Sequence, residues 1–503
     1  MKLDAATAES ALAELARRRA LADGAGRADR IERHRSRGRL TGHERVALAI
    51  DPGSFIPIGR MIHGENLDEA DRTIGGDGEI HGLATVDGRP VLVVANDPTV
   101  KGGTGSAANG RIGGRGIRLH CGLALFDLHQ SGGARITELM SSKFAGAGGA
   151  TMGARHVFRP NLLHLTAVLG DYYPPWNIVQ AEFTAMVKTA HASLTSAPLL
   201  EVATGQREDP DDLAGADMQA NVNGQVDVLA DDEPSAIDYL RRVFAYLPAR
   251  ARDPLPRRLI DDPPDRRDES LNDVLPPNPN RAFDIRKVVT KVLDHDSFIE
   301  WSPGFARNLV TGLGRLDGWP VVVAANQPMV LAGTIDVPAM IKFRRILDLV
   351  NSYSLPLITF LDTPGVLTTK DQEHNRLIAN VYQTSMARLR PAVPKVAVVV
   401  RKGIGFAYMM MSGGDPEGMT LCWPSARIAF TGPDPAARIV HASELAAAPD
   451  PAARQRELAD EMRELSAPRL AAELGYVDAI IDPPDSRRVI IQSIAALQRR
   501  SAH

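Results

Sequence analysis

Cysteine is scarce in this sequence, and so are aromatic residues and long apolar runs. Cys121 and Cys422 are the only two cysteines among 503 residues, and they lack the C-x-x-C spacing of zinc clusters. We therefore expect no disulfide framework and no bound metal. No stretch approaches about 18 consecutive apolar residues, and the chain is charged from Lys2 onward. Neither a membrane helix nor a signal peptide is expected, which favours a cytoplasmic protein.

An excess of one charge is absent as well. The 58 basic and 61 acidic residues give a formal net charge of −3, so a nucleic-acid partner is not expected. The sequence also lacks a G-x-S-x-G elbow, an H-E-x-x-H helix, a Walker loop and a Rossmann fingerprint. Hydrolases, zinc enzymes and NAD enzymes thereby lose their best support. Catalysis by backbone N–H groups remains as a hypothesis.

What the sequence does contain is a repeat of itself. GLATVDGRPVLVVANDPTVKGGT from Gly82 matches GLGRLDGWPVVVAANQPMVLAGT from Gly312 at 13 of 23 positions. In both runs an Asp-Gly pair stands between apolar β-rich stretches, which predicts a tight hairpin turn. Strand patterns alternate with helical ones in each half, which favours α/β layers. The expected organisation is a helical segment (1–38), a first domain (39–248), a linker rich in proline and charge (249–281) and a second domain (282–503).

A glycine turn in the first half is a candidate binding site. Ser131, Gly132 and Gly133 follow a strand pattern and are expected to open a helix, where free N–H groups can hold an anion or a carbonyl oxygen. A plain strand-to-helix turn is the alternative interpretation. The matching turn of the second half contains Gly365. Two equivalent turns in a duplicated fold suggest two facing half-sites for two bound groups.

A second turn in the C-terminal half is a candidate oxyanion hole. Gly405, Phe406 and Ala407 leave a buried strand pattern and enter a helical one. The N–H groups near Phe406 and Ala407 then stand at a helix start, where such donors can stabilise an enolate oxygen. Met409 follows in a run of three methionines, which is more often part of a core than of a ligand pocket.

Six motifs, taken in chain order, carry a family resemblance. They are NDPTVKGGT from Asn96, SGGARI from Ser131, NQPMVLAGTID from Asn326, DQEHN from Asp371, RKGIGFAY from Arg401 and CWPSARIAFTG from Cys422. The dipeptide Pro364-Gly365 carries the same resemblance. Together they resemble the carboxyltransferase (β) subunits of propionyl-CoA and methylcrotonyl-CoA carboxylases. The resemblance implies an α/β fold of two tandem crotonase-like (ClpP/crotonase) domains from an internal duplication. It also implies a ring-shaped hexamer with its active sites between subunits.

The activity implied by this resemblance is transfer of a carboxyl group from carboxybiotin to the α-carbon of an acyl-CoA, through an enolate held by backbone amides. No A-M-K-M biotinylation motif occurs, so biotin is expected on a partner, a biotin carboxylase/biotin carrier subunit. Met409 falls where the family carries a residue that tunes acyl-chain choice, which implies an apolar acyl group. The predicted catalytic residues are Gly365, Gly405, Phe406 and Ala407, and the predicted cofactor-binding residues are Ser131, Gly132, Gly133 and Met409.

The chain departs from the family's pattern at three places. Gln130 stands where the family has aspartate, and Phe406 stands where it has glycine. The third departure is residues 170–177, GDYYPPWN, which replace a glycine-rich oxyanion segment of the kind C-A-G-G-A. Pro174 and Pro175 have no N–H group to donate. We therefore predict that the first half-site is impaired as an oxyanion hole, whereas the second retains enolate stabilisation.

Two other functions stay open on the sequence alone. One is a biotin-independent decarboxylase of a malonyl-type thioester, because decarboxylation needs one oxyanion hole and no second cofactor. The other is a non-catalytic β-like subunit within a mixed hexamer.

Overall fold

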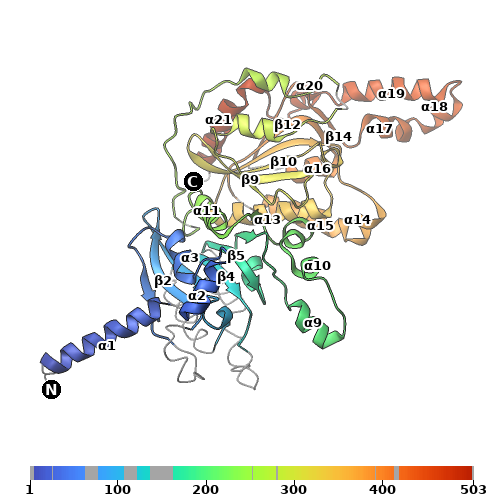
Figure 1. Cartoon of the computed structure of the whole chain (residues 1–503). Helices are drawn as coiled ribbons and strands as arrows, with labels where there is room; N and C mark the ends of the chain where they lie inside the picture. The colour runs from blue at the N-terminus through green and yellow to red at the C-terminus, as the bar shows by residue number, and fades with distance from the viewer. Residues whose placement is uncertain are drawn as a thin grey trace. The chain divides into compact units, whose positions relative to one another are not determined.

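The computed structural model of the chain describes residues 5–24, 26–62, 77–106, 122–135, 162–251, 253–278, 281–390, 392–412 and 418–500. It divides into two compact units, Met1–Pro254 and Leu255–His503 (Figure 1). Both units combine helices with one mixed sheet, which confirms the α/β class. The domain bounds drawn from the sequence stay a prediction.

The first unit contains a seven-stranded sheet in the order β1-β2-β3-β4-β5-β6-β7. Strands β1 to β3 are antiparallel neighbours, and β3 to β7 are parallel. Helix α11 packs on β5 and β6. In chain order the elements are α1 Ala5–Asp23, α2 Ala28–Arg35, α3 Gly42–Ala49, β1 Ile56–Ile58, β2 Glu79–Val86, β3 Arg89–Asn96, η2 Lys101–Gly103, β4 Ala124–Ser131, β5 His164–Tyr172, α8 Trp176–Gln180, β6 Phe183–Val187, α9 Ala197–Thr204, α10 Pro210–Ala214, η3 Met218–Val222, β7 Val228–Ala230 and α11 Glu233–Phe244.

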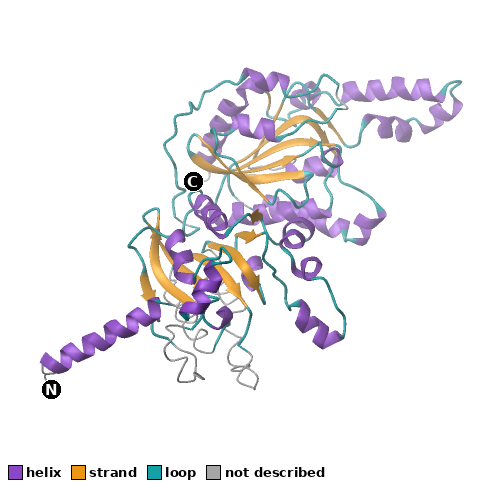
Figure 2. Ribbon diagram, in the orientation of Figure 1, coloured by secondary structure: helices purple, strands orange, loops and turns teal. Residues whose placement is uncertain are grey.

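The second unit repeats this plan in an eight-stranded sheet, ordered β15-β13-β12-β11-β10-β9-β8 with β14 paired to β12. Helix α13 packs on β9, and α21 packs on β12. Figure 2 shows the strands as one twisted layer with helices against it. The elements are η4 Glu269–Asp273, α12 Arg286–Val292, β8 Ile299–Trp301, β9 Leu309–Leu316, β10 Trp319–Asn326, η5 Leu331–Gly333, α13 Val337–Tyr353, β11 Leu357–Thr363, α14 Lys370–His374, α15 Leu377–Leu389, β12 Lys395–Ile404, α16 Gly405–Met411, β13 Gly418–Cys422, β14 Arg427–Ala429, α17 Pro433–Val440, α18 Ala442–Ala447, α19 Pro451–Leu465, α20 Pro468–Glu473, β15 Ala479–Ile480, η6 Pro483–Asp485 and α21 Ser486–Arg500.

The central strands of both sheets are buried along almost their whole length. Strand β3 is buried from Val91 to Asn96, and β10 is buried from Pro320 to Asn326. Parallel strands covered on both faces take continuous apolar runs of this kind, because neither face meets water. The same apolar run therefore builds the centre of each unit, and it brings the carboxyl ends of the parallel strands to one edge.

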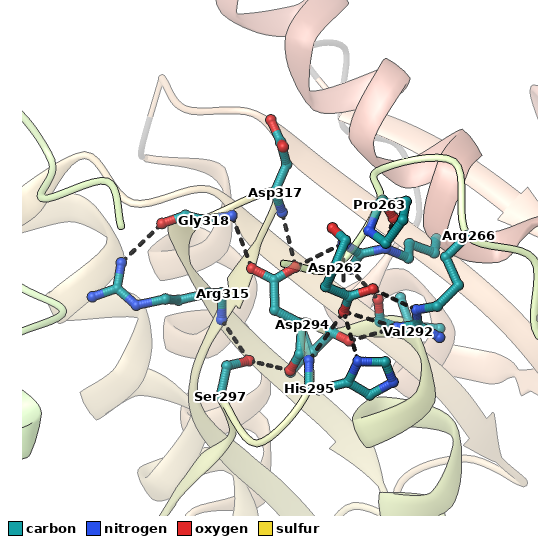
Figure 3. A network of polar contacts seen from close by, with 12 residues as sticks. Asp262, Pro263, Arg266, Val292, Asp294, His295, Ser297, Arg315, Asp317 and Gly318 are labelled. Atoms are coloured by element: carbon teal, nitrogen blue, oxygen red, sulfur yellow. Dashed lines mark hydrogen bonds and ion pairs between the residues drawn. The ribbon is translucent and has the colours of Figure 1, made fainter. Parts of the chain in front are cut away.

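Each unit has a hairpin whose turn is held by one aspartate. Asp87-Gly88 and Asp317-Gly318 have positive φ angles of 50° and 73°, and 51° and 76°, as a two-residue primed turn requires. The predicted hairpin turns are thus confirmed. In the second unit the Asp294 carboxylate accepts the N–H groups of Asp317 at 3.0 Å and Gly318 at 2.8 Å (Figure 3).

The first unit repeats this arrangement, since Asp51 accepts the N–H groups of Asp87 at 3.0 Å and Gly88 at 2.8 Å. The surroundings of the two carboxylates differ. Asp294 is 2% exposed and lies 2.8 Å from the buried Arg487 guanidinium, whereas the Asp51 side chain is 27% exposed. The duplication kept the turn and its aspartate but changed their burial.

From Leu255 onward, the stretch expected to be a linker belongs to the second unit. The Arg487 guanidinium donates to the carbonyl of Pro263 at 3.0 Å, and Arg266 forms an ion pair with Asp262 at 2.7 Å (Figure 3). Arg257 lies 2.9 Å from Asp317, next to the hairpin turn. The Arg257 contact attaches the proline-rich stretch to the hairpin and the Arg487 contact attaches it to α21, whereas the Arg266–Asp262 pair lies within the stretch.

Candidate active site

The candidate site residues lie where two neighbouring parallel strands end in each unit. In the first unit β4 ends at Ser131, and the ladder pairs this residue with Tyr172 on β5. In the second unit β11 ends at Thr363, which pairs with Gly403 on β12. The first half-site is defined here as residues 131–134 and 172–177, and the second as residues 363–366 and 403–407. The carboxyl ends of parallel strands are where such folds place ligands.

The N–H groups of the first glycine turn have partners within the protein. Gly132 donates to the carbonyl of Gly102 at 3.2 Å, and Gly133 donates to Ser131 Oγ at 3.2 Å. They are not the free donors that the sequence predicted, because η2 and the strand end turn toward them. The helix expected after this turn lies outside the described residues.

Gly365 in the second half-site resembles Gly133 in its contacts. Its N–H donates to Thr363 Oγ1 at 3.2 Å, just as Gly133 donates to a hydroxyl two residues earlier. Both glycines have positive φ angles, 133° and 98°, which other residues adopt only with strain. The two turns thus share this backbone geometry, and their equivalence as half-sites stays a prediction.

Helix α16 starts at Gly405, as the sequence predicted. The N–H groups of Phe406 and Ala407 belong to its first turn, and first-turn donors have no partner within a helix. No side chain caps this helix start. The Phe406 and Met409 side chains are each 57% exposed, whereas Ala407 is buried. The second half-site therefore presents backbone donors beside exposed apolar side chains.

A cavity of about 390 Å³ opens at this helix start. Phe406 and Met409 stand in its wall together with Phe430, Leu474 and Tyr476. The last three residues were not identified as site residues from the sequence, although Phe430 lies in the motif that starts at Cys422. Nothing in a single sequence shows that these segments meet α16. The full lining is Gly405, Phe406, Tyr408, Met409, Ile428, Ala429, Phe430, Leu465, Ala467, Leu470, Ala471, Leu474 and Tyr476. Such a wall suits an apolar group better than a charged one.

A buried ion pair fixes the strand ends of the second half-site. Asp362 is fully buried, and its carboxylate lies 2.7 Å from the Arg401 guanidinium and accepts the N–H of Lys402 at 3.2 Å. Burial lowers the pKa of the Lys402 ammonium, a shift that the Asp362 carboxylate opposes and the Arg401 guanidinium reinforces. The pair ties β11 to β12 beside Gly365 and Gly405.

Gln130 takes the place of this aspartate in the first half-site. Its Oε1 accepts a hydrogen bond from Arg45 Nη2 at 2.5 Å, and Arg45 in turn pairs with Glu233 at 2.7 Å. Gly170 stands where the second unit has Arg401, and a Cβ at Gly170 would lie 2.5 Å from Gln130 Cδ. The departure at Gln130 is therefore accommodated by a partner from another element.

Residues Tyr173 to Trp176 give the first half-site a different turn. Counting onward from the paired strand ends places Pro175 at the position of Phe406 and Trp176 at that of Ala407. Pro175 has no N–H, and the N–H of Trp176 donates to the carbonyl of Pro174 at 3.1 Å. Neither donor position of the second half-site has a free counterpart in the first.

The gap between the two strand ends is also narrower in the first half-site. A Cβ built on Gly133 would lie 2.8 Å from the carbonyl oxygen of Tyr173, whereas one on Gly365 would lie 3.9 Å from that of Ile404. The Tyr173 oxygen thus faces Gly133 at close range. Burial, with the Asp171 charge, raises the pKa of the Tyr173 phenol to about 12, so this phenol is neutral at pH 7.

The described residues contain no group of three or more His, Cys, Asp or Glu side chains that could hold a metal ion. No helix within the described ranges is both long and apolar enough to cross a membrane.

Comparison with known proteins decides the family. The model of the carboxyl transferase domain matches residues 33–503. The chain belongs to this family. It is 34% identical to the propionyl-CoA carboxylase carboxyltransferase subunit of Haloferax mediterranei, over 98% of this chain and 97% of that one. The propionyl-CoA carboxylase beta chain of Cereibacter sphaeroides is 32% identical, over 97% and 96% of the two chains.

A solved structure gives the same result for the fold of this carboxyl transferase family member. Transcarboxylase 12S, described as a hexamer assembly with methylmalonyl-coenzyme A and methylmalonic acid bound, superimposes with a TM-score of 0.92 at 28% identity, over 99% of this chain and 97% of that chain. The chain therefore has two tandem crotonase-like domains. The resemblance inferred from the six motifs is confirmed.

Proposed function

We propose that this chain is the carboxyltransferase subunit of an acyl-CoA carboxylase, moving a carboxyl group from carboxybiotin to the α-carbon of an acyl-CoA. One observation carries the proposal in the structure. Helix α16, whose first turn holds the N–H groups of Phe406 and Ala407, starts at the carboxyl ends of parallel strands, and Gly405 and Phe406 line an apolar cavity there. The whole-length similarity to propionyl-CoA carboxylase subunits supports it and favours neither a biotin-independent decarboxylase nor a non-catalytic subunit.

Within this proposal, Gly365, Gly405, Phe406 and Ala407 form the catalytic turn. The N–H groups of Phe406 and Ala407 hold the oxygen on which negative charge develops as the α-carbon loses its proton. Such a donor typically contributes about 3–4 kcal/mol to stabilisation of the transition state. Gly405 has a positive φ of 61°, which lets the strand turn directly into the helix.

The proposed cofactor-binding residues are Ser131, Gly132, Gly133 and Met409. Met409 contributes an exposed apolar side chain to the cavity, which fits an apolar acyl group. The N–H groups of the glycine turn already have partners within the protein. Gly132 and Gly133 therefore contribute to binding through their small size, since glycine lets a ligand approach the backbone closely. When bound, carboxybiotin supplies the carboxyl group, and the residues named here orient the acceptor and exclude water.

The partner in this proposal is a biotin carboxylase/biotin carrier subunit, and the assembly is a homohexamer. The structural similarity to transcarboxylase 12S, a hexamer, supports the assembly. The relatives named as a carboxyltransferase subunit and a beta chain of propionyl-CoA carboxylase support a carrier on another subunit. The cytoplasmic location stays a prediction, which fractionation of the host's cells tests.

The test removes the N–H donor of Phe406 and leaves the residues around it unchanged. Phe406→Pro deletes the N–H, and proline is tolerated in the first turn of a helix. Phe406→Ala is the matched control, because it removes the same ring but keeps the donor. With a biotin carboxylase, a biotin carrier and propionyl-CoA, we expect F406P to lower kcat by about 10²–10³-fold, the typical loss for one oxyanion donor. Equal rates for F406P and F406A would contradict the proposed oxyanion hole.

A further inference from the structure

A cluster of polar side chains lies buried in the sheet of the first unit. Asn96, Asp127, His129, His164 and Thr166 are each no more than 6% exposed. The Asp127 carboxylate lies 2.8 Å from His129 Nε2 and 3.0 Å from His164 Nε2. His129 Nδ1 lies 2.9 Å from Asn96 Oδ1, and Thr166 Oγ1 lies 3.0 Å from His164 Nε2. Burying a carboxylate costs free energy even when it is paired, which suggests that the cluster has a role beyond packing.

The fold itself does not require this cluster. At the two positions of β11 that match the carboxylate and the stacked imidazole of β4, the second unit has Thr359 and Leu361. The β12 position that matches Thr166 is Ala397. The positions of Asn96 and His164 are taken by Asn326 and Lys395, which are also buried. The second unit therefore builds the same sheet without the carboxylate and without either imidazole.

The cluster contacts the chain on both sides of the Tyr173–Trp176 turn. Before the turn, the Tyr172 ring stacks on His129 with a centroid distance of 4.4 Å and an interplanar angle of 3°. After the turn, Asn177 Nδ2 donates to Asp127 Oδ2 at 2.6 Å and contacts His129 Nε2. Both anchors come from one buried Asp-His pair, so the two ends of the turn are held by the same support.

The anchored turn lies against the glycine turn of the first half-site. The N–H of Tyr173 donates to the carbonyl of Ser131 at 3.1 Å, and the Tyr173 oxygen faces Gly133. A ligand carbonyl that entered between the two strand ends would have to displace the Tyr173 oxygen.

We propose that Asp127, His129 and Asn177 are positioning residues that hold the Tyr173–Trp176 turn against Gly133 and keep the first half-site closed. The inference rests on the proposed function only in treating this turn as part of a ligand site. The holding of the turn is a property of the free protein, and it is measured without biotin or acyl-CoA.

Trp176 is the probe, because it lies inside the turn while the other three tryptophans, Trp301, Trp319 and Trp423, belong to the second unit. Subtracting the fluorescence of W176F from that of the same protein with Trp176 isolates the turn's signal. We expect N177A and D127N to raise acrylamide quenching of Trp176 about twofold, as local opening exposes the indole. D294N is the matched control, since it alters a buried carboxylate in the other unit.

The expected result is increased quenching in N177A and D127N, with quenching in D294N unchanged even where its Tm falls. Unchanged quenching in N177A, which changes a half-buried side chain, overturns the proposal whether or not D127N folds. Increased quenching in D294N to the same extent also overturns it, because a general loss of stability would then explain the signal. Neither readout depends on carboxyltransferase activity, so failure of this inference and failure of the proposed function are distinguishable.

Discussion

The two half-sites come from one duplicated unit, yet they offer opposite chemistry to a ligand. In the second, helix α16 presents the N–H groups of Phe406 and Ala407 beside a cavity. In the first, Pro175 has no donor and the N–H of Trp176 is used within the turn. The ladders and hairpins that carry these turns are almost the same in both units. Duplication therefore preserved the scaffold and left the connecting turns free to change, which is where function resides in such folds.

The strand ends of the two half-sites differ in charge, and substitutions there are expected to give the largest change in the free energy of unfolding. R401M leaves the fully buried Asp362 carboxylate without its closest cation, at a cost of about 3–5 kcal/mol in the free energy of unfolding. In the first half-site Gln130 stands at the position of Asp362, and Q130A removes this neutral amide at an expected cost of about 1–2 kcal/mol. Chemical denaturation of both variants measures the difference. Equal losses would show that the charge of Asp362 has no special weight.

Restoring the missing N–H donors in the first half-site is expected to make its turn similar to that of the second half-site. Replacing residues 173–176 with a glycine-rich segment of the family type restores N–H groups, and one recovered donor is worth up to about 10²–10³-fold in rate. The measurement is carboxylation of short and medium acyl-CoAs with a biotin donor. If the natural protein already turns over at about 1–10³ s⁻¹, normal for an enzyme, the first half-site is not impaired.

Local patterns predicted the parts of this molecule that local chemistry determines. The Asp-Gly hairpin turns, the start of α16 and the duplication were all readable from the sequence, because each depends on neighbouring residues. The partner of the Gly132 N–H was not, since it is the carbonyl of Gly102, brought close only by the sheet.

The walls of the cavity and the buried cluster escaped prediction for the same reason. Phe430 lies in a recognised motif and Tyr476 lies further along the chain, but no spacing in the sequence shows that their side chains meet Phe406. Asp127 and Asn177 meet only once β4 and β5 are paired. Side chains that converge through tertiary packing leave no periodic signal in one sequence.

The two hairpin aspartates allow a smaller but sharper comparison. D294N weakens a buried acceptor of two N–H groups and a guanidinium, which is expected to cost about 1.5–3 kcal/mol. D51N changes a partly exposed carboxylate with the same two N–H partners, and we expect a loss below about 1 kcal/mol. Urea midpoints of the two variants test the ranking. A larger loss in D51N would contradict the view that burial sets the weight of this contact.

The smallest expected effect concerns pH at the edge of the first half-site. His191 is partly exposed and lies 2.9 Å from Asp171 and 3.0 Å from Asp211. Burial alone would lower the pKa of this imidazole, but the two carboxylates outweigh burial and raise it. A raised pKa in the folded state means that the stabilisation is fully present below the unfolded-state pKa of about 6.5 and is lost as pH rises through the folded-state pKa. H191Q should therefore be less stable than the natural protein at pH 5 and equally stable at pH 9. The difference at pH 5 is expected to be under about 1 kcal/mol, because both carboxylates are exposed. Thermal denaturation across this range decides, and a loss in H191Q that is the same at both pH values would show that the imidazole acts by packing and not by charge.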